Sequence, residues 1–311
     1  MQDLGTLGGA DSFPSGGCNN ERSDLVAGAS FTNSTANAST GIPTQHAFLW
    51  DKGTITDIPT LGGTFAFAQC TNDQAQVIGQ SSFLGDVGCD PSDPLNTCAE
   101  HAFSWDHGIT SDLGTLGGSF SVAIWLNDAG EAVGGANTKD DASFYATRWK
   151  NSKISDLGTL EGDCFSIANA VNSSGQIIGQ SFSCDFPFIS RAVVWEHGSI
   201  VDLNAAIPAN PTLQLVETDN INDHGEIVGR GLPAGCDNLD LCGHVFLLIP
   251  CAGGQGCEGN DGSSARSNSP AITRSAASKS QRCHMTKEFV AQLRARVAQR
   301  HHIPGLGGPR D

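Results

Sequence analysis

The chain has 311 residues, of which 38 are glycine, 39% are hydrophobic and only 16% are charged. This composition is typical of many short strands joined by glycine turns, and it disfavours a helical protein, which would carry more Lys, Glu and Leu. The formal net charge is −16, but residues 252–311 hold nine Lys and Arg against four Asp and Glu, so the first 251 residues have a net charge of −21. Such an acidic body argues against nucleic acids and anionic membranes as its partners.

A glycine-rich phrase opens the chain and returns about every fifty residues. Its copies are DLGTLGG (3–9), DIPTLGG (57–63), DLGTLGG (112–118), DLGTLEG (156–162) and the degenerate DLNAAIP (202–208). After each phrase comes an Asn turn with a β-branched run ending in Gly, such as VNSSGQIIG (171–179), and later an aromatic run such as HAFLW (46–50). The N-x-x-G turn predicts a hairpin, because Asn tolerates turn conformations and Gly supplies a positive φ.

Each repeat therefore predicts four short strands: one ending in Asp-Leu, one entering the Asn turn, one ending in Val/Ile-Gly and one ending in Trp. Five such units over residues 1–250 predict an all-β protein, namely a β-propeller of about five four-stranded blades. An open β-repeat solenoid is the alternative. The first repeat is expected to be clipped, since only Met1 and Gln2 precede Asp3.

The motifs DLGTLGG, INDHGEIVG (221–229) and HAFLW resemble those of the HAF-repeat family of bacterial extracellular proteins. The resemblance covers residues 1–250, recurs five times, and includes a last unit similar to the family's closing repeat. It implies an extracellular or cell-surface β-repeat protein. It implies no catalytic residues, because the family is defined by its repeat.

The Asp of the phrase recurs at five equivalent positions: Asp3, Asp57, Asp112, Asp156 and Asp202. In one interpretation each carboxylate caps the glycine turn that follows it. In the other, the five carboxylates form a ring that binds a cation such as Ca²⁺. No other cofactor is expected, because the phrase lacks the lysine and the strand–helix context of a phosphate-binding loop.

Four tryptophans share one repeat position: Trp50, Trp105, Trp149 and Trp195. A large apolar residue at the same site in each unit is expected to pack one sheet on the next, rather than to stack on a ligand. His46, His101 and His244 open the aromatic run of their repeats, but other residue types replace them elsewhere, so the repeat demands no common histidine chemistry.

The chain contains 11 cysteines without a CxxC pair or zinc-ligand spacing, which predicts disulfides and an oxidising, extracellular setting. The expected pairs are Cys89–Cys98, Cys164–Cys184, Cys236–Cys242 and Cys251–Cys257, with Cys18–Cys70 as a further pair between neighbouring repeats and Cys283 left over. No apolar run is long enough for a transmembrane helix. No signal peptide precedes the first repeat, so we expect the sequence to start inside a longer gene product.

After residue 250 the repeat pattern stops. Residues 251–284 are rich in Gly and Ser and predict a flexible linker, and 304–311 form a tail. Residues 285–303 predict a basic amphipathic helix, with Phe289, Leu293 and Val297 on one face. This helix is expected either to remain solvated or to dock on the acidic body or on a neighbouring molecule; a membrane-surface helix is the minor alternative.

These features predict a non-enzymatic extracellular protein that binds or scaffolds an unknown ligand, either protein or glycan. The alternative is a propeller-type glycan hydrolase or lyase that uses carboxylates in the loops 81–100, 136–144 and 231–243. Such an enzyme needs two carboxyl groups roughly 5–10 Å apart. The candidates are Asp86, Asp90, Asp93, Asp140, Asp141, Asp237 and Asp240.

Overall fold

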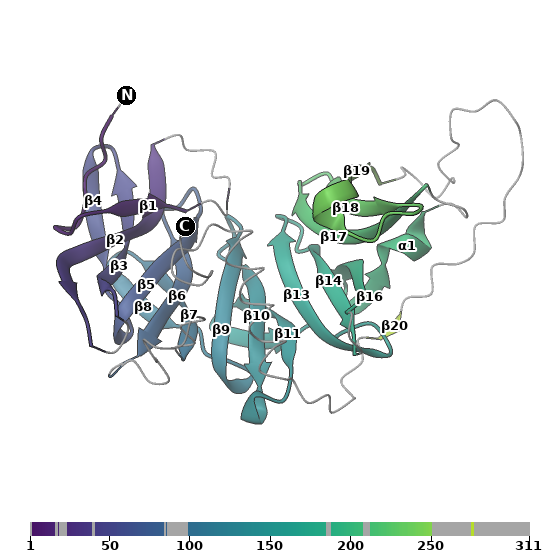
Figure 1. Cartoon of the computed structure of the whole chain (residues 1–311), viewed down its shortest axis with the longest axis horizontal. Coiled ribbons are helices and arrows are strands. Elements are labelled where there is room, and N and C mark those ends of the chain that lie inside the picture. Colours follow the sequence, from purple (N-terminus) through teal and green to yellow (C-terminus); the bar gives the residue numbers. More distant parts are fainter. Residues whose placement is uncertain are drawn as a thin grey trace, which may run out of the picture. The chain divides into compact units, whose positions relative to one another are not determined.

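The structure is a computed structural model that describes residues 2–15, 18, 24–38, 41–83, 85, 99–184, 188–207, 212–250 and 275–276 (Figure 1). Within them the chain forms short antiparallel strands and three short helical segments, so the all-β prediction is confirmed. The predicted helix at 285–303, the tail, and all of the predicted linker except residues 275–276 lie outside the described residues. None of the described helices has the length and apolar character needed to span a bilayer.

The first compact unit holds the strands up to Asp156, and these form three four-stranded sheets, the first two of which are joined by a single parallel pair, Gln45 with Phe65. Strands that follow one another along the chain pair antiparallel within each sheet. The first sheet contains β1 (Ser12–Pro14), β2 (Leu25–Ala36), β3 (Pro43–Asp51) and β4 (Thr54–Ile58); the second contains β5 (Gly62–Thr71), β6 (Val77–Phe83), β7 (Glu100–Asp106) and β8 (Ile109–Asp112); the third contains β9 (Gly117–Leu126), β10 (Ala132–Thr138), β11 (Phe144–Lys150) and β12 (Lys153–Asp156), with the 3-10 helix η1 (Lys139–Asp141) before β11.

The second unit begins at Leu157 and holds two further sheets with the same antiparallel pairing. The fourth sheet contains β13 (Asp163–Val171), β14 (Ile177–Ser183), β15 (Ser190–Glu196) and β16 (Ser199–Asp202), with β20 (Ser275–Ala276) added beside β16; the fifth contains β17 (Leu213–Ile221), β18 (Ile227–Pro233) and β19 (His244–Leu248); the helices are α1 (Leu203–Ala206) and α2 (Leu239–Cys242).

The sheets and the sequence repeats are out of phase by one strand. The strand that ends in Asp-Leu does not begin a sheet, because it pairs with the Trp strand that precedes it, as Ile55 pairs with Trp50 and Ile200 with Trp195. The first sheet therefore has its four strands although the first repeat is clipped. The sheet with only three strands among the described residues is the fifth.

The Asn turn closes its own hairpin and also holds the next sheet. The Asn72 Oδ1 atom accepts hydrogen bonds from the backbone N–H groups of Gln74 and Gln76, at 3.1 and 3.0 Å. Its Nδ2 group donates to the carbonyl oxygen of Asn127 in the following sheet at 3.1 Å. The same bond joins Asn172 to the carbonyl of Asn222 at 3.1 Å, so the repeated Asn links successive sheets within each unit.

The third residue after the Asn of each described turn, expected to need a positive φ, adopts one in the structure. Gly130, Gly175 and Gly225 have φ values of 71°, 80° and 78°. In the second sheet the same position is Ala75, which adopts φ 62° although its β-carbon disfavours the left-handed region.

A second bond between successive sheets depends on a carboxylate, and it predicts a pH effect. Asp223 Oδ1 accepts the backbone N–H of Ser173 at 2.8 Å, and this hydrogen bond lowers the pKa of Asp223 below its ordinary value of 3.8. A lowered folded-state pKa adds stability that is present above pH 3.8 and is lost as the pH falls through the folded-state value. We expect Asp223→Asn to unfold at a lower urea concentration than the wild type at pH 7, with the difference shrinking below pH 4. A difference that is equal at pH 7 and pH 3 would contradict this.

The four repeat tryptophans are buried, with exposed fractions between 3% and 9%. In the first unit, Phe103 and Trp105 of the second sheet pack against Ala47 and Leu49 of the first sheet. Trp149 of the third sheet packs in the same way against a cluster that includes Ile78 of the second. The Trp position therefore belongs to the core between sheets, as the sequence predicts.

Three disulfide bonds lie among the described residues. Cys164–Cys184 staples the β13–β14 hairpin and Cys236–Cys242 closes a short loop before β19, with Cα atoms 4.9 and 5.9 Å apart. Cys18–Cys70 joins the chain before β2 to β5 of the second sheet. The predicted pairs Cys89–Cys98 and Cys251–Cys257, and Cys283, lie outside the described residues.

Candidate functional site

The glycine phrase uses its own polar groups. The Thr115 hydroxyl donates to the carbonyl of Gly118 at 2.8 Å and accepts the N–H of Gly117 at 3.1 Å, and Thr60 makes the equivalent bonds in the preceding phrase. The Leu61 N–H donates to the Ser81 hydroxyl at 2.8 Å. Backbone N–H groups that an anion would need are thus already bonded within the protein, so the phrase is a structural turn.

The repeated Asp residues act mainly as caps of this turn. Asp3, Asp112 and Asp202 each accept the backbone N–H two residues further on, at 2.7–2.9 Å. Asp57 lacks that donor because residue 59 is proline, and it bonds instead to His46 Nδ1 at 2.8 Å. Among the described residues, no three His, Cys, Asp or Glu side chains come together as metal ligands do. The cation ring, which also included Asp156, therefore has no support in the structure.

The loop carboxylates proposed for a glycan hydrolase are placed for structural roles where they are described. Asp141 accepts bonds from the Ser119 N–H and hydroxyl and from Asn137 Nδ2, at 2.7–2.8 Å. Asp240 forms an ion pair with Arg230 at 3.3 Å. Asp140 is exposed in the turn of η1, as is Asp237 before α2. Asp86, Asp90 and Asp93 lie outside the described residues.

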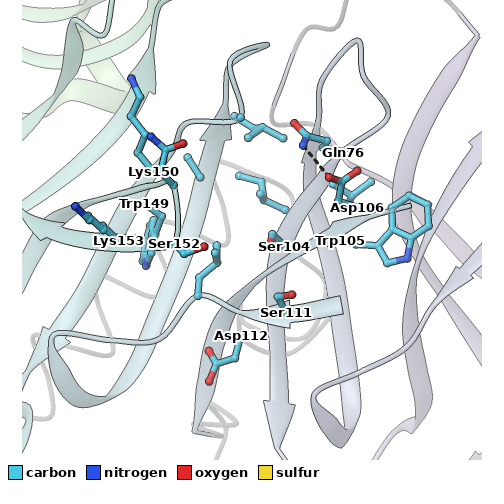
Figure 2. A pocket seen from close by; sticks show the side chains of 17 residues that line it. Gln76, Ser104, Trp105, Asp106, Ser111, Asp112, Trp149, Lys150, Ser152 and Lys153 are labelled. Carbon is cyan, nitrogen blue, oxygen red and sulfur yellow. Dashed lines mark hydrogen bonds between the residues drawn. The ribbon is translucent and has the colours of Figure 1, made fainter. Parts of the chain in front are cut away.

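A groove of about 280 Å³ lies between the second and third sheets, and the sequence did not reveal it. Two hairpins form its walls: β7–β8 on one side and β11–β12 on the other (Figure 2). The β7–β8 wall carries the carboxylates of Asp106 and Asp112, and the β11–β12 wall carries the ammonium groups of Lys150 and Lys153. We call this site the lysine–aspartate groove.

The basic wall arises from a change within the repeat. Lys150 and Lys153 are cross-strand partners beside a two-residue turn, where like charges repel. The buried carboxylate of Glu131 offsets one of them, since its Oε2 lies 2.7 Å from Lys150 Nζ and its Oε1 lies 2.5 Å from Arg148 Nε. Lys153 is exposed and has no ion-pair partner among the described residues. Its charge is therefore available to a ligand.

Hydrogen bonds hold both carboxylates of the acidic wall. Partial burial raises the pKa of Asp112, but the hydrogen bonds from His101 and from the Gly114 N–H outweigh it, so the net pKa lies below 3.8. Asp106 accepts a hydrogen bond from Gln76 Nε2 at 3.2 Å, drawn as the dashed line in Figure 2. The lowered pKa keeps the carboxyl group of Asp112 ionised at neutral pH.

Trp149 also lines the groove. Trp149 is 3% exposed, and its indole Nε1–H has no hydrogen-bond partner in the part of the chain that the structure describes. That nitrogen atom is itself buried, and the equivalent Nε1 of Trp195 in the fourth sheet is likewise without a partner among the described residues, so the unpaired N–H belongs to the repeat core. The Trp105 indole, in contrast, projects away from the groove (Figure 2). The groove thus combines a wall that carries lysine ammonium groups with a wall that carries carboxylates.

No family model and no curated protein matches this chain. Two solved structures are similar in fold, each with a TM-score of 0.45. One is the β-propeller domain, with open velcro topology, of the Trilobed protease from Pyrococcus furiosus, at 11% identity; the match covers 73% of this chain and 64% of that one. The other is the Pyrococcus horikoshii acylaminoacyl peptidase, at 10% identity, with 74% of this chain and 36% of that one covered. The chain thus spans less than two thirds of either neighbour.

This finding corrects the prediction of a non-enzymatic binding or scaffolding protein, because both neighbours are peptidases or parts of one. It equally gives no place to the glycan hydrolase or lyase that stood as the alternative. The prediction failed because packing and turn roles of the repeated residues say nothing about the chemistry of the whole protein. At an identity of 11% or less, the likeness does not transfer the neighbours' activity to this chain.

Proposed function

We propose that this chain is a substrate-holding part of a peptidase-like protein, and that the lysine–aspartate groove binds an extended polypeptide segment. The observation that carries the proposal is the pair of oppositely charged walls in one groove, formed by Lys153 on one side and Asp106 and Asp112 on the other. A peptide offers carbonyl or carboxylate oxygens to the first wall and amide or ammonium donors to the second.

Other ligand classes fit this groove less well. A polyanion would be attracted by Lys153 but repelled by the carboxylates of Asp106 and Asp112. A polycation would be attracted by these carboxylates but repelled by Lys153. A neutral sugar would leave the charges of both walls without partners.

We further propose an oxidising, extracytoplasmic setting and membership in the HAF-repeat family. Three disulfides among the described residues support the setting, because disulfides are rare in reducing compartments. The five-fold recurrence of the Asp-Leu phrase and the aromatic strand supports the family.

A pool of random hexapeptides with free termini tests the proposed site by equilibrium dialysis against the full chain. We expect Lys153→Glu to lower the retained peptide at least fivefold, because it reverses the charge of the free ammonium group. Lys139→Glu is the matched control, since Lys139 is an exposed lysine of the same sheet outside the groove, and it should bind as the wild type does. Equal retention by the two variants would contradict the proposal.

The same dialysis samples, analysed by mass spectrometry, show whether the chain cleaves what it binds. Intact peptides would assign cleavage to another part of the protein, as the proposal expects. Cleaved peptides would place the catalytic residues in this chain.

A further inference from the structure

The fifth sheet ends on a strand whose outer edge has no neighbour among the described residues. In the other four sheets the aromatic strand pairs on that side with a fourth strand, namely β4, β8, β12 or β16. In the fifth sheet β19 pairs only with β18. An open edge presents unpaired N–H and C=O groups that can pair with another extended chain.

The side chains of β19 show what is missing. His46 and His101 open their aromatic strands, and each bonds through Nδ1 to the Asp of its fourth strand, at 2.8 and 3.0 Å. His244 occupies the same position, since it lies opposite Gly231 as His101 lies opposite Ser81. His244 is exposed and has no side-chain partner among the described residues. The sheet thus keeps the histidine but lacks the aspartate.

The residues beside His244 lack cover as well. Val245 and Leu247 are 72% and 56% exposed. Their counterparts in the first sheet, Ala47 and Leu49, are 0% and 4% exposed, because the fourth strand and the following sheet both cover them. In the first sheet, Ile58 follows the Asp of the fourth strand, lies opposite Ala47 and is itself fully buried. An apolar residue in that place would therefore lie against Val245.

The complete sheets supply the register of the missing strand. Ile55 lies opposite Trp50, Asp57 opposite Phe48 and Ile58 opposite Ala47. Transferred to β19, this order places an incoming Ile opposite Leu248, an Asp opposite Phe246 and a Leu or Ile opposite Val245. The Asp then lies beside His244.

We propose that β19 is a strand-accepting site that binds an extended segment of a partner polypeptide with the pattern Ile-x-Asp-Leu/Ile, in antiparallel pairing, through a His244–Asp contact. The fourth strands β4, β12 and β16 carry this pattern, and β8 carries it with Thr110 in place of the Ile, but each is already paired in its own sheet. These four strands are therefore not the donor, either in this molecule or in a second copy. Backbone pairing supplies affinity at such an edge, and the side chains at alternate positions supply specificity.

The probe is a labelled peptide GTITDI, which copies residues 53–58, titrated into the full chain and followed by fluorescence anisotropy. We expect saturable binding that weakens about tenfold with His244→Gln or with the peptide GTITNI, because each removes one member of the charge-assisted bond. His197→Gln is the matched control, since His197 is another exposed histidine of the same unit, and it should leave the affinity unchanged.

A charge reversal tests the contact itself. His244→Glu should reject GTITDI and accept GTITKI, because the ion pair is then restored with opposite signs. Hydrogen exchange should at the same time slow at the amides of β19 when the cognate peptide is bound. The absence of binding would overturn the proposal, because the peptide would then pair with no strand edge. Equal binding to the wild type and to both His244 variants would also overturn it, because the peptide would then pair with an edge without regard to His244.

Discussion

Gly179→Ala is expected to prevent folding of the fourth sheet, or to cost at least about 3 kcal/mol in the free energy of unfolding, the upper end of the range for overpacking. A β-carbon at Gly179 would lie 2.0 Å from the carbonyl oxygen of Ile167 and 2.9 Å from the Cα of Ala168. Both atoms belong to the backbone of the paired strand β13, so no side chain can move aside. Urea denaturation followed by circular dichroism measures the loss.

The matched control for this steric effect is Gly198→Ala. Gly198 has a φ of 75°, so alanine there is strained, but its β-carbon would meet no atom within 4 Å. We expect a loss of only about 1 kcal/mol, the cost of placing alanine in the left-handed region. If both variants lost the same stability, backbone conformation rather than the close approach would explain the conserved spacing of the Val/Ile-Gly motif within this chain.

Lys150→Glu is expected to destabilise the third sheet by about 3 kcal/mol, because it places a second carboxylate beside the buried carboxylate of Glu131. The neighbouring repeats suggest a second substitution that would restore the lost stability. Where the equivalent of Lys150 is acidic, the equivalent of Glu131 is glutamine: Gln76 bonds to Asp106 and Gln176 to Glu196, at 3.2 and 2.9 Å. The double variant Glu131→Gln/Lys150→Glu should therefore recover at least half of the lost stability.

Thermal and urea denaturation of the two single variants and the double variant measure this coupling as a double-mutant cycle. Glu131→Gln alone should lose about 1 kcal/mol, because Arg148 and Lys150 are only partly buried and water can solvate them. Losses in the double variant that equal the sum of the single losses would show that the residue pair is not coupled.

The sequence was sufficient to predict the strands, the Asn turns and the buried tryptophans, because each depends on local periodicity that recurs five times. It misplaced the sheet boundaries by one strand, because hydrogen bonding between strands is not visible in a repeat pattern. The partner of Asp57 could have been inferred, since Pro59 has no N–H for it to accept and His46 opens the paired strand.

The lysine–aspartate groove was missed for a different reason. It depends on two hairpins from successive sheets lying side by side, which no local pattern encodes. A signal was nevertheless present in the aligned repeats: Glu131 and Lys150 stand where the second and fourth repeats have glutamine and an acidic residue. Comparing such paired positions within one chain would have pointed to the third sheet.

The offset between sheets and repeats also bears on how such a chain can be cut or enlarged. Since the last strand of one sheet and the glycine phrase that opens the next belong to a single repeat, excising a whole repeat removes the end of one sheet and the beginning of its successor together. The two remaining halves have matching edges and can rejoin into one intact sheet. Gene duplication or deletion in steps of about fifty codons thus leaves equivalent strand pairs at every junction between repeats. A break at the boundary between two sheets, in contrast, leaves each tryptophan strand with its paired strands, so this boundary is the natural point for a designed truncation.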